Sequence, residues 1–215
     1  MIDIIPGIFE ADTKELVRKI ALVLPYVSSV QIDIADNTLV SKRSSTDING
    51  IGKNLGQFRK NELILEAHLI ASQPEQYIKA LAENGFSRII GHVECEDPRN
   101  FLAEARTFEF EVGLAINTDT EVEILEPYLE ELDFVLVMTA ESDGMNEVFQ
   151  SEVVEKIKAI HRNFSDLPIE VDGGITLETA KIAADAGATR LVSSSYIFDK
   201  ESEIQKTIEE LSRLS

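Results

Sequence analysis

The strongest constraint on the fold is the regular alternation of short apolar segments with amphipathic segments along the chain. Eight apolar segments, rich in β-branched residues, have the length of strands: residues 2–5, 29–34, 63–68, 88–91, 111–115, 134–138, 169–171 and 190–192. Several of them are apolar at nearly every position, which is typical of strands covered on both faces. Strict alternation of strands and helices predicts a parallel sheet joined by crossover connections.

Helical periodicity fills the intervals between these strands. The predicted helices are residues 13–24, 74–83, 98–106, 118–129, 152–161, 176–186 and 201–214. Residues 46–60 predict a weaker helix, because Gly50, Gly52 and Gly56 interrupt it. Eight strand–helix units in 215 residues predict one domain, residues 1–215, folded as a (β/α)8 barrel. A doubly wound open sheet is the alternative, but no G-x-G-x-x-G follows the first strand.

The acidic balance of the chain limits its partners. It has 39 acidic and 20 basic side chains, a formal net charge of -19. Such a surface repels phosphate backbones and anionic lipid, so we expect no nucleic-acid or membrane partner, and an anionic ligand held by backbone dipoles. Cys95 is the single cysteine, the first residues do not resemble a signal peptide, and no apolar run approaches the about 20 residues that span a bilayer. We therefore expect a soluble, cytoplasmic protein.

Polar residues stand at the carboxyl ends of most predicted strands, where a (β/α)8 barrel builds its active site. In chain order, these strand ends carry Gly7, Asp33, His68, His92, Asn117, the polar loop of residues 139–147, Asp172, Ser194 and Ser195. Two of the three histidines of the chain belong to this set. Any one of these residues is a weak signal, but together they predict a polar site in the mouth of the barrel.

The stretch IEVDGGIT, residues 169–176, places a carboxylate and two glycines directly after an apolar strand. Asp172 is interpreted as a general base or metal ligand, with a helix cap or turn aspartate as the alternative. Gly173 and Gly174 allow a ligand close to their amides before a helix, and Ser194 and Ser195 would add the facing amides. This pattern predicts a phosphate site, with simple tight turns as the alternative.

Five polar residues lie in or shortly after the second, third and fourth predicted strands. Gln31 and Asp33 are two residues apart and share a face, and an aspartate in this apolar setting must be paired, bound to a metal or solvated. His68 is a candidate ligand, although a lone histidine is more often a hydrogen-bonded core residue. His92 shares its face with Glu94. A hydrogen bond between them, in the core or in support of a site residue, is at least as good an explanation of this pair as a direct part in catalysis.

These residues lie in motifs that resemble ribulose-phosphate 3-epimerases almost from end to end. The segment IIPGIFEAD resembles the family's I-x-P-S-I-L-x-A-D, and VQIDIADNTLV resembles H-x-D-x-M-D-G-x-F-V. EAHLIASQPEQYI resembles D-V-H-L-M-V-x-x-P-x-x-Y-I, and GHVE resembles H-x-E. IEVDGGIT and GATRLVSSSYIF resemble V-D-G-G-I and G-A-x-x-x-V-A-G-S-x-I-F. The ordered set is specific for this family.

The resemblance implies a metal-dependent isomerase of the pentose phosphate pathway. Members interconvert D-ribulose 5-phosphate and D-xylulose 5-phosphate through an enediolate that a divalent metal (Zn, Fe, Mn or Mg) stabilises. By resemblance Asp33 and Asp172 are the acid and base on opposite faces of the sugar. Asp33, His68 and Asp172 are metal ligands, and Gln31 stands at the fourth ligand position. The resemblance also implies a sugar-phosphate ligand and a homo-oligomer.

Several residues depart from the family pattern around one pocket. A serine is replaced by Gly7, a metal-binding histidine by Gln31 and a phosphate-loop glycine by Ser194; two methionines are replaced by Ala35 and Ile70, and a glycine-rich loop by residues 143–146. Gly7, His68 and Gly144 are the expected substrate contacts. A glutamine is a poorer ligand than a histidine for zinc or iron but suits harder cations, so weak or absent metal is expected.

Two hypotheses follow. The first is an active epimerase, on the usual or an altered sugar phosphate, and the retention of both aspartates favours it. The second is an impaired epimerase-like barrel that binds a phosphorylated ligand, which the lost histidine and loop glycines favour. An aldolase or decarboxylase of the related barrels would require Asp-x-Lys on the third strand, where this chain has Glu66-Ala67-His68.

Overall fold

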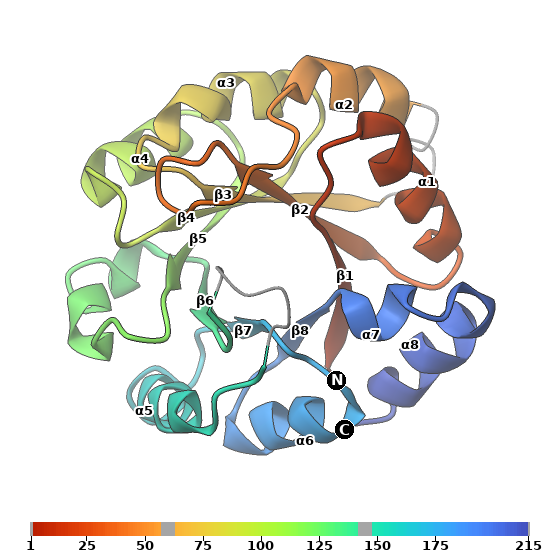
Figure 1. Cartoon of the computed structure of the whole chain (residues 1–215). Coiled ribbons are helices and arrows are strands. Elements are labelled where there is room, and N and C mark those ends of the chain that lie inside the picture. The colour runs from red at the N-terminus through yellow and green to blue at the C-terminus, as the bar shows by residue number, and fades with distance from the viewer. Residues whose placement is uncertain (1, 57–62, 142–147, 215) are drawn as a thin grey trace.

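Eight parallel strands close into a barrel in chain order, with the helices outside it (Figure 1). This computed structural model describes residues 2–56, 63–141 and 148–214. The strands are β1 (Asp3–Ile8), β2 (Ser29–Ala35), β3 (Ile64–Ile70), β4 (Arg88–His92), β5 (Glu111–Ile116), β6 (Phe134–Met138), β7 (Ile169–Asp172) and β8 (Arg190–Ser193). The predicted (β/α)8 barrel is confirmed.

The outer layer consists of α-helices and short 3-10 helices. The α-helices are α1 (Thr13–Val23), α2 (Ile48–Leu55), α3 (Glu75–Glu83), α4 (Pro98–Ala105), α5 (Val154–Asn163), α6 (Leu177–Ala186), α7 (Ser195–Phe198) and α8 (Ile204–Ser212). The 3-10 helices are η2 (Val122–Leu125), η3 (Leu129–Glu131), η4 (Ser151–Val153) and η5 (Glu201–Glu203). Several α-helices begin as their sequences predict: the Asp12 carboxylate accepts from the Lys14 amide at 2.7 Å, and Thr176 and Thr179 form a capping box at α6.

Two details of the sequence-based prediction were wrong. Residues 118–129 do not form an α-helix; two 3-10 turns, η2 and η3, stand there instead. Pro127 lies between these turns, where it removes an amide donor and disfavours helical geometry in the residue before it. In addition, β1 extends to Ile8, so Gly7 lies within the strand, paired with Gln31, rather than after it.

Alternate residues of each strand point to opposite sides, and this separates the apolar shell from a polar interior. The main hydrophobic cluster joins the strands to the helices around them. A smaller cluster includes Ile90, Leu136 and Met138. Gln31, Glu66, Arg88 and Glu170 are all buried, and each stands two or four residues before a polar side chain of the barrel mouth.

Near the amino ends of the strands lies a charge cluster that consists of the buried Glu66, Arg88 and Glu170 and the half-buried Glu111 and Arg190. Arg88 is 2.8 Å from Glu66 and 2.9 Å from Glu111, and Arg190 is 2.6 Å from Glu111. Burial and the neighbouring Glu66 raise the pKa of Glu170 well above its usual value. Neither carboxyl oxygen of Glu170 has a partner at hydrogen-bonding distance and angle within the described part of the chain. A proton on Glu170 balances three carboxyl groups against two guanidinium groups.

Among the described residues, no helix is long and apolar enough to cross a membrane.

Candidate active site

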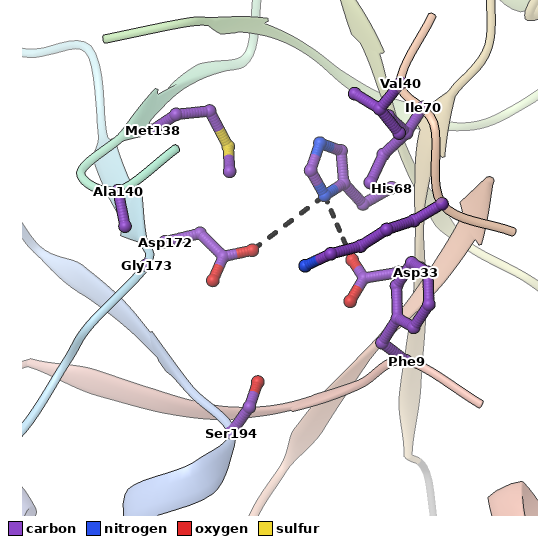
Figure 2. A pocket seen from close by; sticks show the side chains of 11 residues that line it. Phe9, Asp33, Val40, His68, Ile70, Met138, Ala140, Asp172, Gly173 and Ser194 are labelled. Carbon is purple, nitrogen blue, oxygen red and sulfur yellow. Dashed lines mark hydrogen bonds and ion pairs between the residues drawn. The ribbon is translucent and has the colours of Figure 1, made fainter. Parts of the chain in front are cut away.

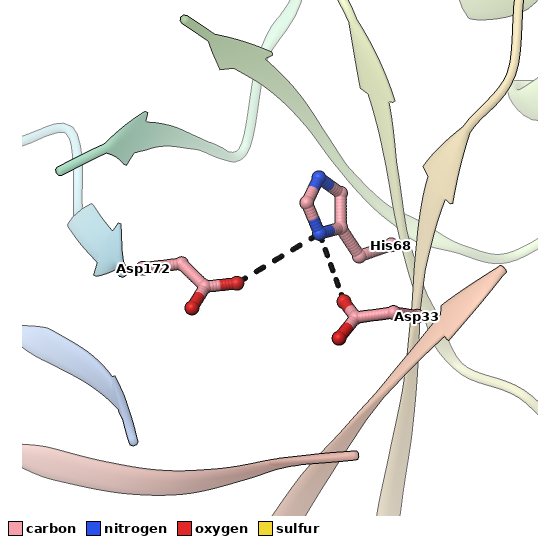
Figure 3. A group of neighbouring side chains, drawn as sticks. All are labelled: Asp33, His68 and Asp172. Carbon is pink, nitrogen blue, oxygen red and sulfur yellow. Dashed lines mark hydrogen bonds and ion pairs between the residues drawn. The ribbon is translucent and has the colours of Figure 1, made fainter. Parts of the chain in front are cut away.

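Three side chains from separate strands converge at the carboxyl end of the barrel (Figure 3). Asp33 lies on β2, His68 on β3 and Asp172 at the end of β7, and all three are buried. The ligand atoms that they offer lie within 4.8 Å of one another. His68 Nδ1 is 3.0 Å from Asp33 Oδ1 and 3.8 Å from Asp172 Oδ2. The structure therefore brings together the two predicted catalytic aspartates and the predicted histidine ligand.

The Gln31 side chain links the two carboxylates. Its Nε2 donates to Asp33 Oδ1 and to Asp172 Oδ2, both at 2.8 Å, and the residue is fully buried. Its carbonyl oxygen, Oε1, has no hydrogen-bond partner in the described segments. The shared face of Gln31 and Asp33 was predicted from their spacing, but the bridge to Asp172 was not. In this orientation the amide is a donor to the carboxylates and is no ligand.

His68 is connected to a second histidine behind the aspartates. His68 Nε2 is 2.8 Å from His92 Nε2, and His92 Nδ1 is 3.1 Å from Glu94 Oε2. Burial lowers the pKa of His68 to about 3 and also lowers the pKa of His92, so both rings are neutral. Burial alone would raise the pKa of Glu94, but the interactions with His92, the Thr120 side chain and the Asn117 amide together outweigh burial, and the pKa is lowered. The supporting hydrogen bond, one of the two sequence-based interpretations of His92 and Glu94, is present.

The convergent residues open into a pocket that also contains residues the sequence did not single out (Figure 2). Phe9, Val40, Lys42, Met138 and Ala140 complete its lining with Asp33, His68, Ile70, Asp172, Gly173 and Ser194. Lys42 is the one lysine or arginine among the described lining residues, and its Nζ atom lies 6.0 Å from the Phe9 ring centroid. The pocket therefore offers an anion a positively charged side chain in addition to the backbone dipoles expected from the sequence.

Hydrogen bonds to β2 and α3 fix the loop that carries Lys42. Ser44 Oγ donates to the Asp33 carbonyl at 2.6 Å and accepts from the Ala35 amide at 2.9 Å. At the start of the loop, Tyr77 donates to Asp36 at 3.0 Å. No hydrophobic periodicity marks such a loop. The pocket position of Lys42 is therefore evident only from the path of the loop over the strand, which the sequence does not reveal.

The glycine pair forms a turn between β7 and α6. Gly173 and Gly174 have φ angles of +117° and +65°, which side-chain-bearing residues rarely adopt. Thr139 and Thr179 donate to their carbonyl oxygens at 2.6 Å and 2.8 Å. Because Thr176 is the N-cap of α6, both glycines precede the helix and are not part of its first turn.

Across the mouth, Ser194 occupies space that Gly7 leaves open. A Cβ built on Gly7 would lie 2.6 Å from Ser194 Oγ and 2.8 Å from Val192 Cγ1. The two departures from the family pattern at positions 7 and 194 are thus neighbours, and the hydroxyl at the mouth comes from the residue after β8 rather than from β1. Ser195 is the first residue of α7, next to the pocket lining. Gly144, an expected substrate contact, lies outside the described residues.

The donor set fits a divalent cation. Two carboxylates and an imidazole nitrogen at this spacing suit zinc, iron or manganese, and the carbonyl oxygen of Gln31 suits a harder ion. Amide orientation follows the hydrogen-bond network, so Gln31 can present Oε1 instead of Nε2 once a cation balances the carboxylates. The unpartnered Oε1 is, within the described segments, available for this exchange.

The chain is similar to known proteins along most of its length. The model of the Ribulose-phosphate 3 epimerase family matches residues 3–198. A ribulose-phosphate 3-epimerase of Schizosaccharomyces pombe is 31% identical over 201 residues, which are 93% of this chain and 88% of that protein. A Bacillus subtilis protein of the same name is 30% identical over 220 residues and covers 98% of each chain.

Comparison of structures supports the barrel. The structure of KGPDC from Streptococcus mutans aligns with a TM-score of 0.75 and 11% identity, covering 100% of this chain and 99% of that one. Identity this low establishes the shared fold alone.

Proposed function

We propose, because the chain belongs to the ribulose-phosphate 3-epimerase family, that it epimerises a pentulose phosphate at C3 in the pocket described above. The observation that carries the proposal is the pairing of Asp33 and Asp172. They come from β2 and β7, and one oxygen of each carboxylate, Asp33 Oδ1 and Asp172 Oδ2, lies 2.8 Å from the same Gln31 Nε2 atom. Inversion at a carbon requires an acid and a base on opposite faces, and two carboxylates placed apart meet that requirement.

The proton transfers follow from this arrangement. One aspartate removes the C3 proton next to the ketone and leaves an enediolate. The other aspartate delivers a proton to C3 from the opposite face, which gives the epimer. Each turnover therefore exchanges the protonation states of Asp33 and Asp172, and the reverse reaction uses the same two groups in exchanged roles.

Asp33, His68 and Asp172 would hold the metal, with Gln31 Oε1 as a further ligand after rotation of its amide. The metal supplies a Lewis acid that acidifies the C3 proton and stabilises negative charge on the substrate oxygens. The chain itself positions the imidazole and the carboxylates, because all three side chains are held in the buried end of the pocket.

The phosphate group is assigned to the turn amides of Gly173 and Gly174 and to those of Ser194 and Ser195 across the mouth. The positive φ angles of the glycines and the threonine bonds to their carbonyls support this assignment. Lys42 adds positive charge in the same pocket, which the net charge of -19 makes valuable for an anionic substrate.

The test is a coupled epimerase assay with D-ribulose 5-phosphate, with and without added Mn²⁺, Mg²⁺ or Zn²⁺. Asp33→Asn and Asp172→Asn should each lower kcat by about 100- to 10,000-fold, the usual contribution of a general acid or base. Asp47→Asn is the matched control, because Asp47 caps α2 away from the pocket and asparagine caps equally well. Turnover of either pocket variant within a few-fold of wild type would remove that aspartate from the chemistry.

A second candidate function is binding of a phosphorylated ligand without turnover. The Gln31 bridge favours it, because the amide occupies both carboxylates that the metal would need. Tight calorimetric binding of ribulose 5-phosphate, with no epimerisation at any metal concentration, would select this candidate. A cytoplasmic location and a homo-oligomer stay predictions, which cell fractionation and light scattering would test.

A further inference from the structure

Behind the pocket, Glu94, His92, His68 and Asp33 form a continuous chain of contacts. The distances are 3.1 Å from Glu94 Oε2 to His92 Nδ1, 2.8 Å between the two Nε2 atoms, and 3.0 Å from His68 Nδ1 to Asp33 Oδ1. The two rings are inclined by only 19°, with centroids 5.0 Å apart. Since their nearest nitrogens are 2.8 Å apart, that separation places the rings edge to edge, the geometry of an in-plane hydrogen bond.

Two neutral imidazoles carry two N–H protons between them, but this chain has three contacts and an acidic residue at each end. One contact must therefore lack a proton. If Glu94 accepts from His92 Nδ1–H, then His92 Nε2 is an acceptor and His68 donates to it from Nε2. His68 Nδ1 is then left with a lone pair directed at Asp33 and Asp172. That arrangement is balanced when a cation lies among those three groups.

We infer that Glu94 and His92 are positioning residues that set the tautomer of His68 and so prepare its Nδ1 for a divalent cation. The inference rests on the proposed function only for the identity of the site; the tautomers can be measured without any activity.

Glutamine at position 94 should reverse the direction of the hydrogen bonds in the chain of contacts from Glu94 through His92 to His68, which we call the histidine relay. Glu94 Oε1 accepts from the backbone amide of Asn117 at 2.9 Å, and a backbone amide can only donate. A glutamine must direct its carbonyl oxygen there, so its NH2 group faces His92 Nδ1. His92 would then carry its proton on Nε2 and donate to His68 Nε2, and the His68 proton would move to Nδ1, where it blocks the cation.

The experiment is ¹⁵N NMR of the ring nitrogens in the metal-free full chain. His161 provides an internal reference, because it lies on the outer helix α5. Wild type should show His92 protonated at Nδ1 and His68 protonated at Nε2. Glu94→Gln should exchange both assignments, whereas Glu94→Asp, still an acceptor, should keep them. Glu96→Gln is the matched control, since Glu96 is exposed and bonds only Gln73 Nε2 among the side chains described.

Calorimetric titration with Zn²⁺ of the same proteins supplies the second measurement. Glu94→Gln should bind about 10- to 100-fold more weakly than wild type, as for other residues that orient metal ligands, and Glu96→Gln should not change the affinity. A wild-type His92 that is bare at Nδ1 would overturn the inference. So would a Glu94→Gln protein with unchanged tautomers, or with exchanged tautomers and full Zn²⁺ affinity. Absence of epimerase activity in a wild type with the expected tautomers would instead count against the proposed function alone.

Discussion

Gln31 competes with a metal for the oxygens of Asp33 and Asp172, and the size of this competition can be worked out from the structure. A cation bound between the carboxylates would have to displace two hydrogen bonds of 2.8 Å from one buried amide. Hydrogen bonds to charged groups contribute about 1.5–3 kcal/mol each, so the displacement costs about 3–6 kcal/mol. At 1.4 kcal/mol for each factor of ten, about 100- to 10,000-fold in metal affinity is lost to the amide.

Two substitutions separate competition from ligation. Gln31→Leu removes the competing donors together with the Oε1 oxygen, and Gln31→His removes the donors and adds an imidazole. We expect metal affinity to rise in both proteins, by at least about 100-fold in Gln31→His. Gln76→His, on the exposed face of α3, is the control for a new surface histidine.

The assay is calorimetric titration with Mn²⁺ and Zn²⁺, together with the shift of Tm at fixed metal concentration. A ligand that binds only the folded state raises stability in proportion to the logarithm of its concentration over Kd, so the two measurements must agree. If wild-type protein purified without added metal carries a full equivalent of tightly bound zinc, the competition argument is wrong. It is equally wrong if both Gln31 variants bind metal no better than wild type.

Three further predictions concern the barrel interior and the pocket mouth. The raised pKa of Glu170 means that the folded chain retains a proton that the unfolded chain loses above a pH of about 4.3, so stability falls as pH rises through the folded pKa. Glu170→Gln should remove this loss, so in urea unfolding the variant should gain more stability relative to wild type at pH 8 than at pH 5. Equal effects of the substitution at both pH values would contradict this. Gly7→Ser should cost about 1–3 kcal/mol of unfolding free energy by crowding Ser194, and adding Ser194→Gly should recover part of it, whereas strictly additive effects in the double-mutant cycle would disprove the contact. Lys42→Met should raise the KM for the sugar phosphate about 10- to 100-fold and Lys42→Arg much less, with an unchanged KM as the opposing result.

The fold and the central site residues could be predicted because both depend on strand periodicity. Alternation placed Gln31 and Asp33 on one face, and the barrel rule placed Asp33, His68 and Asp172 at one end. The contacts between strands could not be predicted, because they depend on the register of strands far apart in sequence. The Gln31 bridge from β2 to β7 is such a contact.

Two other features escaped prediction for local reasons. Lys42 lies in a loop whose path is set by hydrogen bonds from Ser44 and not by any sequence period. The segment 118–129 has helical amphipathicity, but Pro127 limits it to two short 3-10 turns. In both places, tertiary contacts or a single proline outweigh the pattern that periodicity can detect.

The histidine relay and the Gln31 bridge bear differently on whether the barrel is an enzyme. In the bridge, two N–H donors of Gln31 stabilise the two carboxylates in place of a cation, and a binding protein without metal could keep this arrangement. The relay has no such use, since two protons cannot satisfy three contacts between Glu94, His92, His68 and Asp33 unless a cation or a third proton is present. A buried chain that needs a cation or an extra proton for balance would destabilise a barrel that supplies neither, because unsatisfied buried polar contacts are destabilising. The presence of the histidine relay therefore favours a metal-dependent epimerase in which Gln31 lowers the affinity for the metal without abolishing the metal site.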